Sequence, residues 1–159
     1  MDSSSMSMTV AIICLITMSA YFSATETAFS SYNRIRVKNM AEDGNKRAAL
    51  VLSMSESYDR LLSTILIGNN IVNITATTIS AVLFTKLLGE GRGPTVSTIV
   101  LTVVVLIFGE VSPKSIAKEH PEKFAMFSAP LLRVLMVMLL PLQQPQIPVY
   151  SLFFSLAEL

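Results

Sequence analysis

The stretch that decides the fold is Phe108-Gly109-Glu110-Val111-Ser112-Pro113-Lys114. It follows residues 95–108, which carry no ionisable side chain and suit a membrane helix. Glu110 therefore lies where such a helix should continue, and a carboxylate at membrane depth indicates a functional site. Pro113 removes a backbone donor and clashes with the carbonyl of Gly109, so we expect a broken helix with exposed carbonyl oxygens. The alternative is a kinked helix in which Glu110 only pairs with Lys114.

The composition is that of a membrane protein. Hydrophobic residues make up 52% of the chain and charged residues 14%, and the mean hydropathy is +0.58. Soluble domains carry about a quarter charged residues. The net charge of +1 is too small to favour a nucleic-acid partner. The single Cys14 and the single His120 do not form a zinc motif. We expect neither enzyme activity nor a catalytic residue.

A first span is expected to begin near the N-terminus. Residues 8–22 are apolar but number only about 15, short of the roughly 20 that cross a bilayer. The helix must then continue through residues 23–30, where Ser23, Glu26, Thr27 and Ser30 share one face. This predicts a polar stripe at membrane depth. The alternative is a helix that ends early and leaves Glu26 in interfacial water.

The second apolar run, residues 61–88, carries an unusual number of amide and hydroxyl groups. Asn69 and Asn73 are four residues apart and share a helix face, and Asn70 lies at its edge. Asparagine oxygens are neutral ligands for hard cations, so these side chains predict a polar site. The alternative is hydrogen bonding between helices, for which Asn, Ser and Thr are common donors and acceptors in membranes.

The remaining segments predict the topology. Residues 32–60 are rich in Lys and Arg, which places them on the cytoplasmic side, and they favour an amphipathic helical hairpin with its turn at Gly44-Asn45. Residues 124–140 are interpreted as a juxtamembrane helix, with a fourth span as the alternative. We expect the N-terminus outside, the C-terminus in the cytoplasm, one domain over residues 1–140, and an irregular or helical segment over residues 141–159.

Taken together, three motifs resemble the transmembrane domain of the cyclin M and CorC magnesium transporters. They are Ser23-Ala24-Thr25-Glu26-Thr27-Ala28-Phe29-Ser30, Gly68-Asn69-Asn70-Ile71-Val72-Asn73 and Gly109-Glu110-Val111-Ser112-Pro113-Lys114. The resemblance implies an all-α homodimer of three-span subunits in the cell membrane that exports Mg²⁺, driven by Na⁺ entry. It also implies cytoplasmic nucleotide-binding modules in a full-length chain, so this sequence resembles an isolated membrane domain or a fragment.

Chemistry and resemblance point to the same candidate metal ligands. Mg²⁺ takes six oxygen ligands, and a mostly neutral set permits its release. The predicted site comprises Ser23, Glu26, Asn69, Asn70, Asn73, Gly109 and Glu110. The first four ligands we expect are Ser23, Asn69, Asn73 and the Gly109 carbonyl, whereas the two glutamates tune charge or bind Na⁺. Two rival hypotheses remain: a Mg²⁺ channel, and a non-transporting Mg²⁺ sensor or scaffold for cytoplasmic modules.

Overall fold

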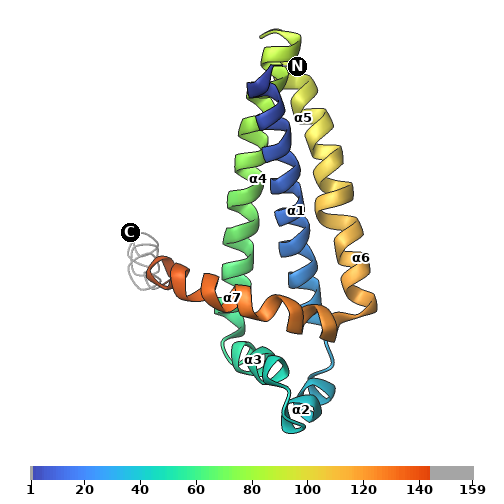
Figure 1. Cartoon of the computed structure of the whole chain (residues 1–159), viewed down its shortest axis with the longest axis vertical. Helices are drawn as coiled ribbons and strands as arrows, with labels where there is room; N and C mark the ends of the chain where they lie inside the picture. The colour runs from blue at the N-terminus through green and yellow to red at the C-terminus, as the bar shows by residue number, and fades with distance from the viewer. Residues whose placement is uncertain (1, 144–159) are drawn as a thin grey trace, which may run out of the picture.

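The computed structural model describes residues 2–143, and every regular element in that part of the chain is a helix. Three helical rods stand side by side (Figure 1), and each is long and apolar enough to cross a membrane. The rods are α1 (Ser3–Ser31), α4 (Tyr58–Leu88) and a composite third span over Gly93–Glu119. The predicted all-α membrane fold with three spans is confirmed.

The first span continues through the polar residues after Phe22 to Ser31. The alternative interpretation, a helix that ends early, is therefore wrong. The 29 residues of α1 extend about 43 Å at 1.5 Å per residue, which is enough to cross a hydrocarbon core of about 30 Å. The helix itself satisfies several hydroxyl groups, which donate to the carbonyl four residues earlier: those of Thr9, Thr17, Thr27 and Ser30. The polar residues therefore remain compatible with a membrane helix.

The third span contains the predicted break in the form of a π-helical segment. Its parts are α5 (Gly93–Val104), η1 (Val105–Val111) and α6 (Ser112–Glu119). The Ser112 N–H donates to the Ile107 carbonyl, five residues back, as is typical of a π-helix. The span continues past Pro113 to Glu119, because the proline lies in the first turn of α6, where it is tolerated.

The basic loop forms the predicted hairpin, with α2 (Arg34–Glu42) and α3 (Lys46–Ser55). Each helix has an asparagine N-cap: Asn33 accepts from the Arg36 N–H, and Asn45 accepts from the N–H groups of the next turn. Gly44 between them has a φ of +92°, which favours glycine. The turn at Gly44-Asn45 is therefore confirmed.

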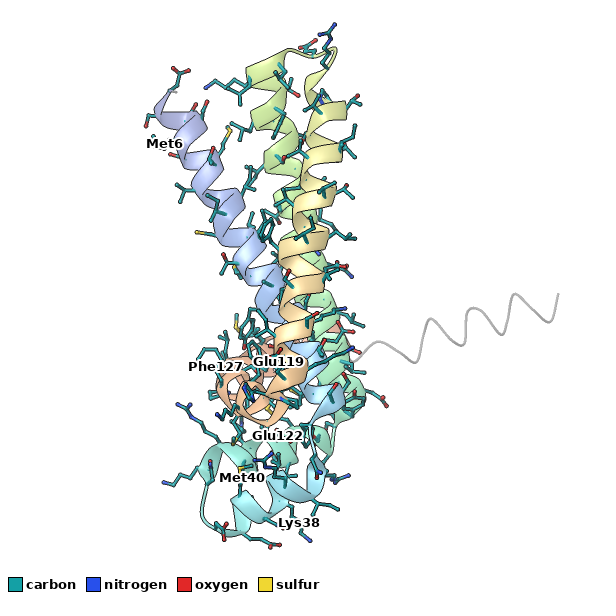
Figure 2. The ribbon with its side chains drawn as sticks, turned by 90° about the vertical axis from the view of Figure 1, so that its right-hand side faces the viewer. Met6, Lys38, Met40, Glu119, Glu122 and Phe127 are labelled. Carbon is teal, nitrogen blue, oxygen red and sulfur yellow. The ribbon has the colours of Figure 1, made fainter. Side chains whose placement is uncertain are left out.

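The last described helix, α7 (Pro121–Gln143), lies across the lower ends of the upright helices (Figure 1). It packs on α1, α3 and α4 through the buried Ala125, Ala129 and Leu132, and the Tyr21 hydroxyl donates to the Ser128 carbonyl at 3.1 Å. Figure 2 shows Phe127 of α7 at the foot of the bundle, with Met6 at the opposite end. The juxtamembrane helix is confirmed, and a fourth span is not observed among residues 2–143.

The predicted domain boundary at Leu140 falls inside α7, which continues through Pro141 to Gln143. The rest of the predicted C-terminal segment, residues 144–159, lies outside the described residues.

The second and third spans approach closely at the end opposite to α7. Ser80 and Ser97 are fully buried there and hydrogen-bond through their hydroxyls at 2.8 Å. A Cβ on Gly93 would lie 2.5 Å from the Thr85 Cα and 2.7 Å from the Phe84 carbonyl oxygen. Small residues thus let the backbones of α4 and α5 touch, as is common where membrane helices pack.

We expect Gly93→Ala to lower the melting temperature of the protein. The new methyl group would collide with backbone atoms, which cannot move aside as the tip of a side chain can, and overpacking costs about 1–3 kcal/mol. Gly91→Ala is the matched control, because a Cβ there would have no neighbour within 4 Å. Thermal melts in detergent measure both variants, and equal melting temperatures would contradict this close approach.

Candidate functional site

Three helices meet at a polar junction near the middle of the spans. Ser19 Oγ of α1 donates to Asn69 Oδ1 of α4 at 3.1 Å. Gly109 of η1 is so close to the same serine that a Cβ on it would lie 3.1 Å from Ser19 Oγ. The junction therefore brings two of the predicted site residues, Asn69 and Gly109, to the same serine.

The two asparagines of α4 interact directly. Asn73 Nδ2 donates to Asn69 Oδ1 at 3.4 Å, which leaves Asn73 Oδ1 as the free acceptor of the pair. Asn73 Oδ1 and Ser23 Oγ are both buried and have no hydrogen-bond partner among the described residues. A buried acceptor without a partner costs about 1–3 kcal/mol, and its lone pairs suit a hard cation. Thr25 is also buried and was not a predicted ligand.

A cleft of about 220 Å³ lies between α4 and the α5–η1 segment, next to this junction. Apolar side chains form part of its wall: Leu101, Val105 and Leu106. Its polar lining consists of an amide, a carboxylate and three hydroxyl groups, contributed by Asn73, Glu110, Thr77, Thr98 and Thr102. Glu110 and Asn73 therefore line the same cleft.

Two of the cleft hydroxyls already have an acceptor for their proton. Thr77 donates to the Asn73 carbonyl at 2.8 Å, and Thr98 donates to the Pro94 carbonyl at 2.9 Å. Their oxygen lone pairs therefore remain available as ligands or acceptors. The described residues contain no cluster of three or more His, Cys, Asp and Glu side chains. A cation bound here would take most of its ligands from amides, hydroxyls and backbone carbonyls.

The two glutamates have different surroundings. Lys114 Nζ lies 3.4 Å from Glu26 Oε2, so Lys114 pairs with the first span and not with Glu110. The kinked-helix alternative, with a Glu110–Lys114 pair, is wrong on this point. Glu110 is half-buried, lines the cleft and has no ion-pair partner among residues 2–143. Of these two glutamates, Glu110 is the one whose charge no neighbouring cation compensates among the described residues.

The structure brings some of the predicted residues together and separates others. Asn69, Asn73 and Gly109 gather around the junction, and Glu110 is reached through the cleft that Asn73 lines. Ser23 lies one turn along α1 from Ser19 and is buried. Glu26 is held by Lys114, and Asn70 is exposed on α4. Four residues of the junction and the cleft are not among the predicted site residues: Ser19, Thr77, Thr98 and Thr102.

A four-residue spacing of hydroxyl side chains is the sequence pattern that could have indicated three of these residues. Ser19 precedes Ser23 by four residues and therefore shares its helix face, and Thr98 and Thr102 are separated in the same way. Ser19, Thr98 and Thr102 lie in runs that are otherwise mostly apolar, so the composition of these runs does not point to them.

Comparison with known proteins bears on the whole chain. Residues 10–158 match the family described as the cyclin M transmembrane N-terminal domain. The chain is 45% identical, over 125 residues, to the UPF0053 inner membrane protein YfjD of Escherichia coli, covering 79% of this chain and 29% of that protein. It is 43% identical, over 133 residues, to a UPF0053 protein of Haemophilus influenzae, covering 84% and 31%.

A more distant relative has a functional name. The polyamine export protein of Haemophilus influenzae is 27% identical over an alignment that covers 92% of this chain and 37% of that protein. The chain thus spans only about a third of the length of these relatives. The family match and the three apolar helices together identify a membrane protein. This chain belongs to the family of cyclin M transmembrane N-terminal domains.

Proposed function

We propose that this domain exports Mg²⁺ through a cation site formed by the polar junction and the cleft beside it. The observation that carries the proposal is Asn73 Oδ1, a buried acceptor without a partner on a residue that both contacts Asn69 and lines the cleft of Glu110. The ligands in this proposal are Ser23, Asn69, Asn73 and the Gly109 carbonyl. Asn70 contributes from the edge of the site, and the charges of Glu26 and Glu110 tune it.

The donor types fit a transported Mg²⁺ ion. Mg²⁺ prefers six oxygens at about 2.0 to 2.1 Å and gives up its waters reluctantly. Amide and hydroxyl oxygens replace some of those waters without the charge that would hold the ion permanently. The uncompensated carboxylate of Glu110 attracts the cation into a low-dielectric cleft, where Coulomb attraction is stronger than in water.

The cleft also supports the proposal of a homodimer. Thr77, Thr98 and Thr102 are exposed at its rim, on the side of a bundle that lies in the lipid bilayer. A cleft with a carboxylate is unfavourable against hydrocarbon, and a second copy of the chain would cover it. The carboxylate of Glu110 is the group that needs this cover, because exposed threonines such as Thr75, Thr77 and Thr78 donate to carbonyls of their own helix.

Orientation and regulation complete the proposal. The basic residues of α2 and α3 support a cytoplasmic position for that end of the bundle, and with it an N-terminus outside. Cytoplasmic nucleotide-binding modules in a longer chain would act on α7, which contacts α1, α3 and α4. Na⁺ entry as the driving force stays a prediction from the family resemblance.

The decisive experiment is Mg²⁺ flux in proteoliposomes with and without an opposing Na⁺ gradient. We expect Mg²⁺ efflux that the Na⁺ gradient accelerates. Flux that is equal with and without Na⁺ would overturn the coupling, and currents far above exchanger turnover would favour a channel. Complete lack of flux, with Mg²⁺-dependent stabilisation retained, would favour a sensor or scaffold.

Polyamine export is the second candidate function. It is favoured by the named relative and by the apolar wall of the cleft, where Leu101, Val105 and Leu106 could contact methylene groups. A polyamine carries several cationic amines, however, and Glu110 is the carboxylate that lines this cleft among the described residues. The same proteoliposomes loaded with spermidine separate the two substrates.

A further inference from the structure

A second hollow lies at the α7 end of the bundle, away from the proposed cation site. It measures about 310 Å³ and is bordered by α3, the first turn of α4 and the second half of α7. Two guanidinium groups line it, from Arg60 of α4 and Arg133 of α7. The remaining lining residues are Ser53, Met54, Ser57, Met136 and Val137.

Arg133 gives this hollow a positive charge. Arg133 has no ion pair or hydrogen bond within residues 2–143, and the nearby acidic residues of the chain, Glu56 and Asp59, are not among the lining residues. Ser57 is the N-cap of α4 and makes no side-chain capping hydrogen bond. Two arginines and serine hydroxyls that converge on one space are the groups that bind a phosphate in proteins.

The position of the hollow favours a phospholipid over a soluble molecule as the source of the phosphate. The hollow lies where α4 begins, and α7 crosses the foot of the bundle there (Figure 1). Because α4 is a candidate membrane span, we infer that its end lies at the level of the lipid headgroups. Beside Arg133, α7 exposes apolar side chains: Val134 is 55% exposed, Val137 60% and Met138 67%. A soluble phosphate would gain nothing from these side chains, whereas the acyl chains of a phospholipid would cover them.

We propose that this hollow, the Arg60–Arg133 site, binds the phosphate headgroup of an anionic phospholipid whose acyl chains lie along α7. Basic pockets beside membrane helices bind such headgroups in other proteins. The bound lipid would link α4 to α7, so it would couple the second span to the helix that crosses α1, α3 and α4.

The test uses the whole chain in detergent, with native mass spectrometry to count bound phosphatidylglycerol and phosphatidylcholine. We expect the parent to retain phosphatidylglycerol in preference, and Arg133→Gln to weaken its binding about tenfold, as expected for the loss of one charged hydrogen-bond donor. Arg47→Gln is the matched control, since it removes the same charge from the exposed surface of α3. We expect binding within about twofold of the parent for this control, because Arg47 does not line the hollow.

Several outcomes would overturn the site. Equal weakening by Arg133→Gln and Arg47→Gln would show a diffuse charge effect, and unchanged binding in Arg133→Gln would show that the hollow is not used. Displacement of the lipid by millimolar inorganic phosphate would point to a soluble phosphate ligand. Arg133→Lys is a second variant that keeps the charge, and its binding should lie between those of the parent and Arg133→Gln.

Discussion

Replacing Asn73 by alanine is expected to remove most of the thermal stabilisation that Mg²⁺ gives to the protein. The substitution deletes a buried acceptor that has no hydrogen-bond partner among the described residues. Hydrogen bonds to charged groups contribute about 1.5–3 kcal/mol, so losing one oxygen ligand should weaken Mg²⁺ binding by about tenfold to a hundredfold. Ser23→Ala should act in the same direction, because Ser23 Oγ is buried and unpartnered in the same way.

The measurement is a thermal melt of each variant with and without Mg²⁺, and the quantity compared is the rise in melting temperature that Mg²⁺ causes. If Asn73 and Ser23 only join helices, each alanine substitution lowers the free energy of unfolding without Mg²⁺ by about 0.6 kcal/mol. Mg²⁺ then raises the melting temperature of the variants as much as that of the parent. Asn39→Ala is the matched control, since it removes an exposed amide from α2. A full Mg²⁺ shift in both Asn73→Ala and Ser23→Ala would exclude these ligands.

Much of the fold follows from local rules that the sequence displays directly. Length and hydropathy predict the three spans, and Gly44 with the Asn45 cap predicts where α2 ends and α3 begins. The four-residue spacing of Asn69 and Asn73 predicts that their side chains meet, and they do so at 3.4 Å. The cap and the asparagine pair depend on neighbours within about one helical turn, and each span depends on one continuous run of about 20 residues.

The sequence did not predict the contacts that form between two helices. Ser19 joins the site because α1 places it against Asn69 and Gly109, and the register between helices is set by packing that no local pattern encodes. The predicted alternative of a Glu110–Lys114 pair is wrong for a related reason. A separation of four residues brings side chains together on an α-helix, but the π-helical segment that contains Glu110 changes the residues per turn, and Lys114 pairs with Glu26 instead.

Glu110→Gln is expected to reduce Mg²⁺ flux in proteoliposomes at least about tenfold while the protein remains folded. The carboxylate lines the cleft without an ion-pair partner among residues 2–143, so its charge acts on whatever cation enters. Removing it weakens the attraction by more than the same change would at the surface, because the surrounding wall of Leu101, Val105 and Leu106 lowers the local dielectric. The amide keeps the shape of the side chain, so the melting temperature without Mg²⁺ should change little.

Glu119→Gln separates this local effect from a general change in charge. Glu119 lies on the same span as Glu110 but is exposed at the end of α6, beside the foot of the bundle (Figure 2). Flux in Glu119→Gln should stay within about twofold of the parent, since an exposed charge is screened beyond about 10 Å at 0.1 M salt. Glu110→Asp should recover part of the flux, because the negative charge returns on a shorter side chain. Equal flux in Glu110→Gln and the parent would assign Glu110 a structural role and leave Glu26, already paired with Lys114 at 3.4 Å, as the remaining predicted carboxylate of the site.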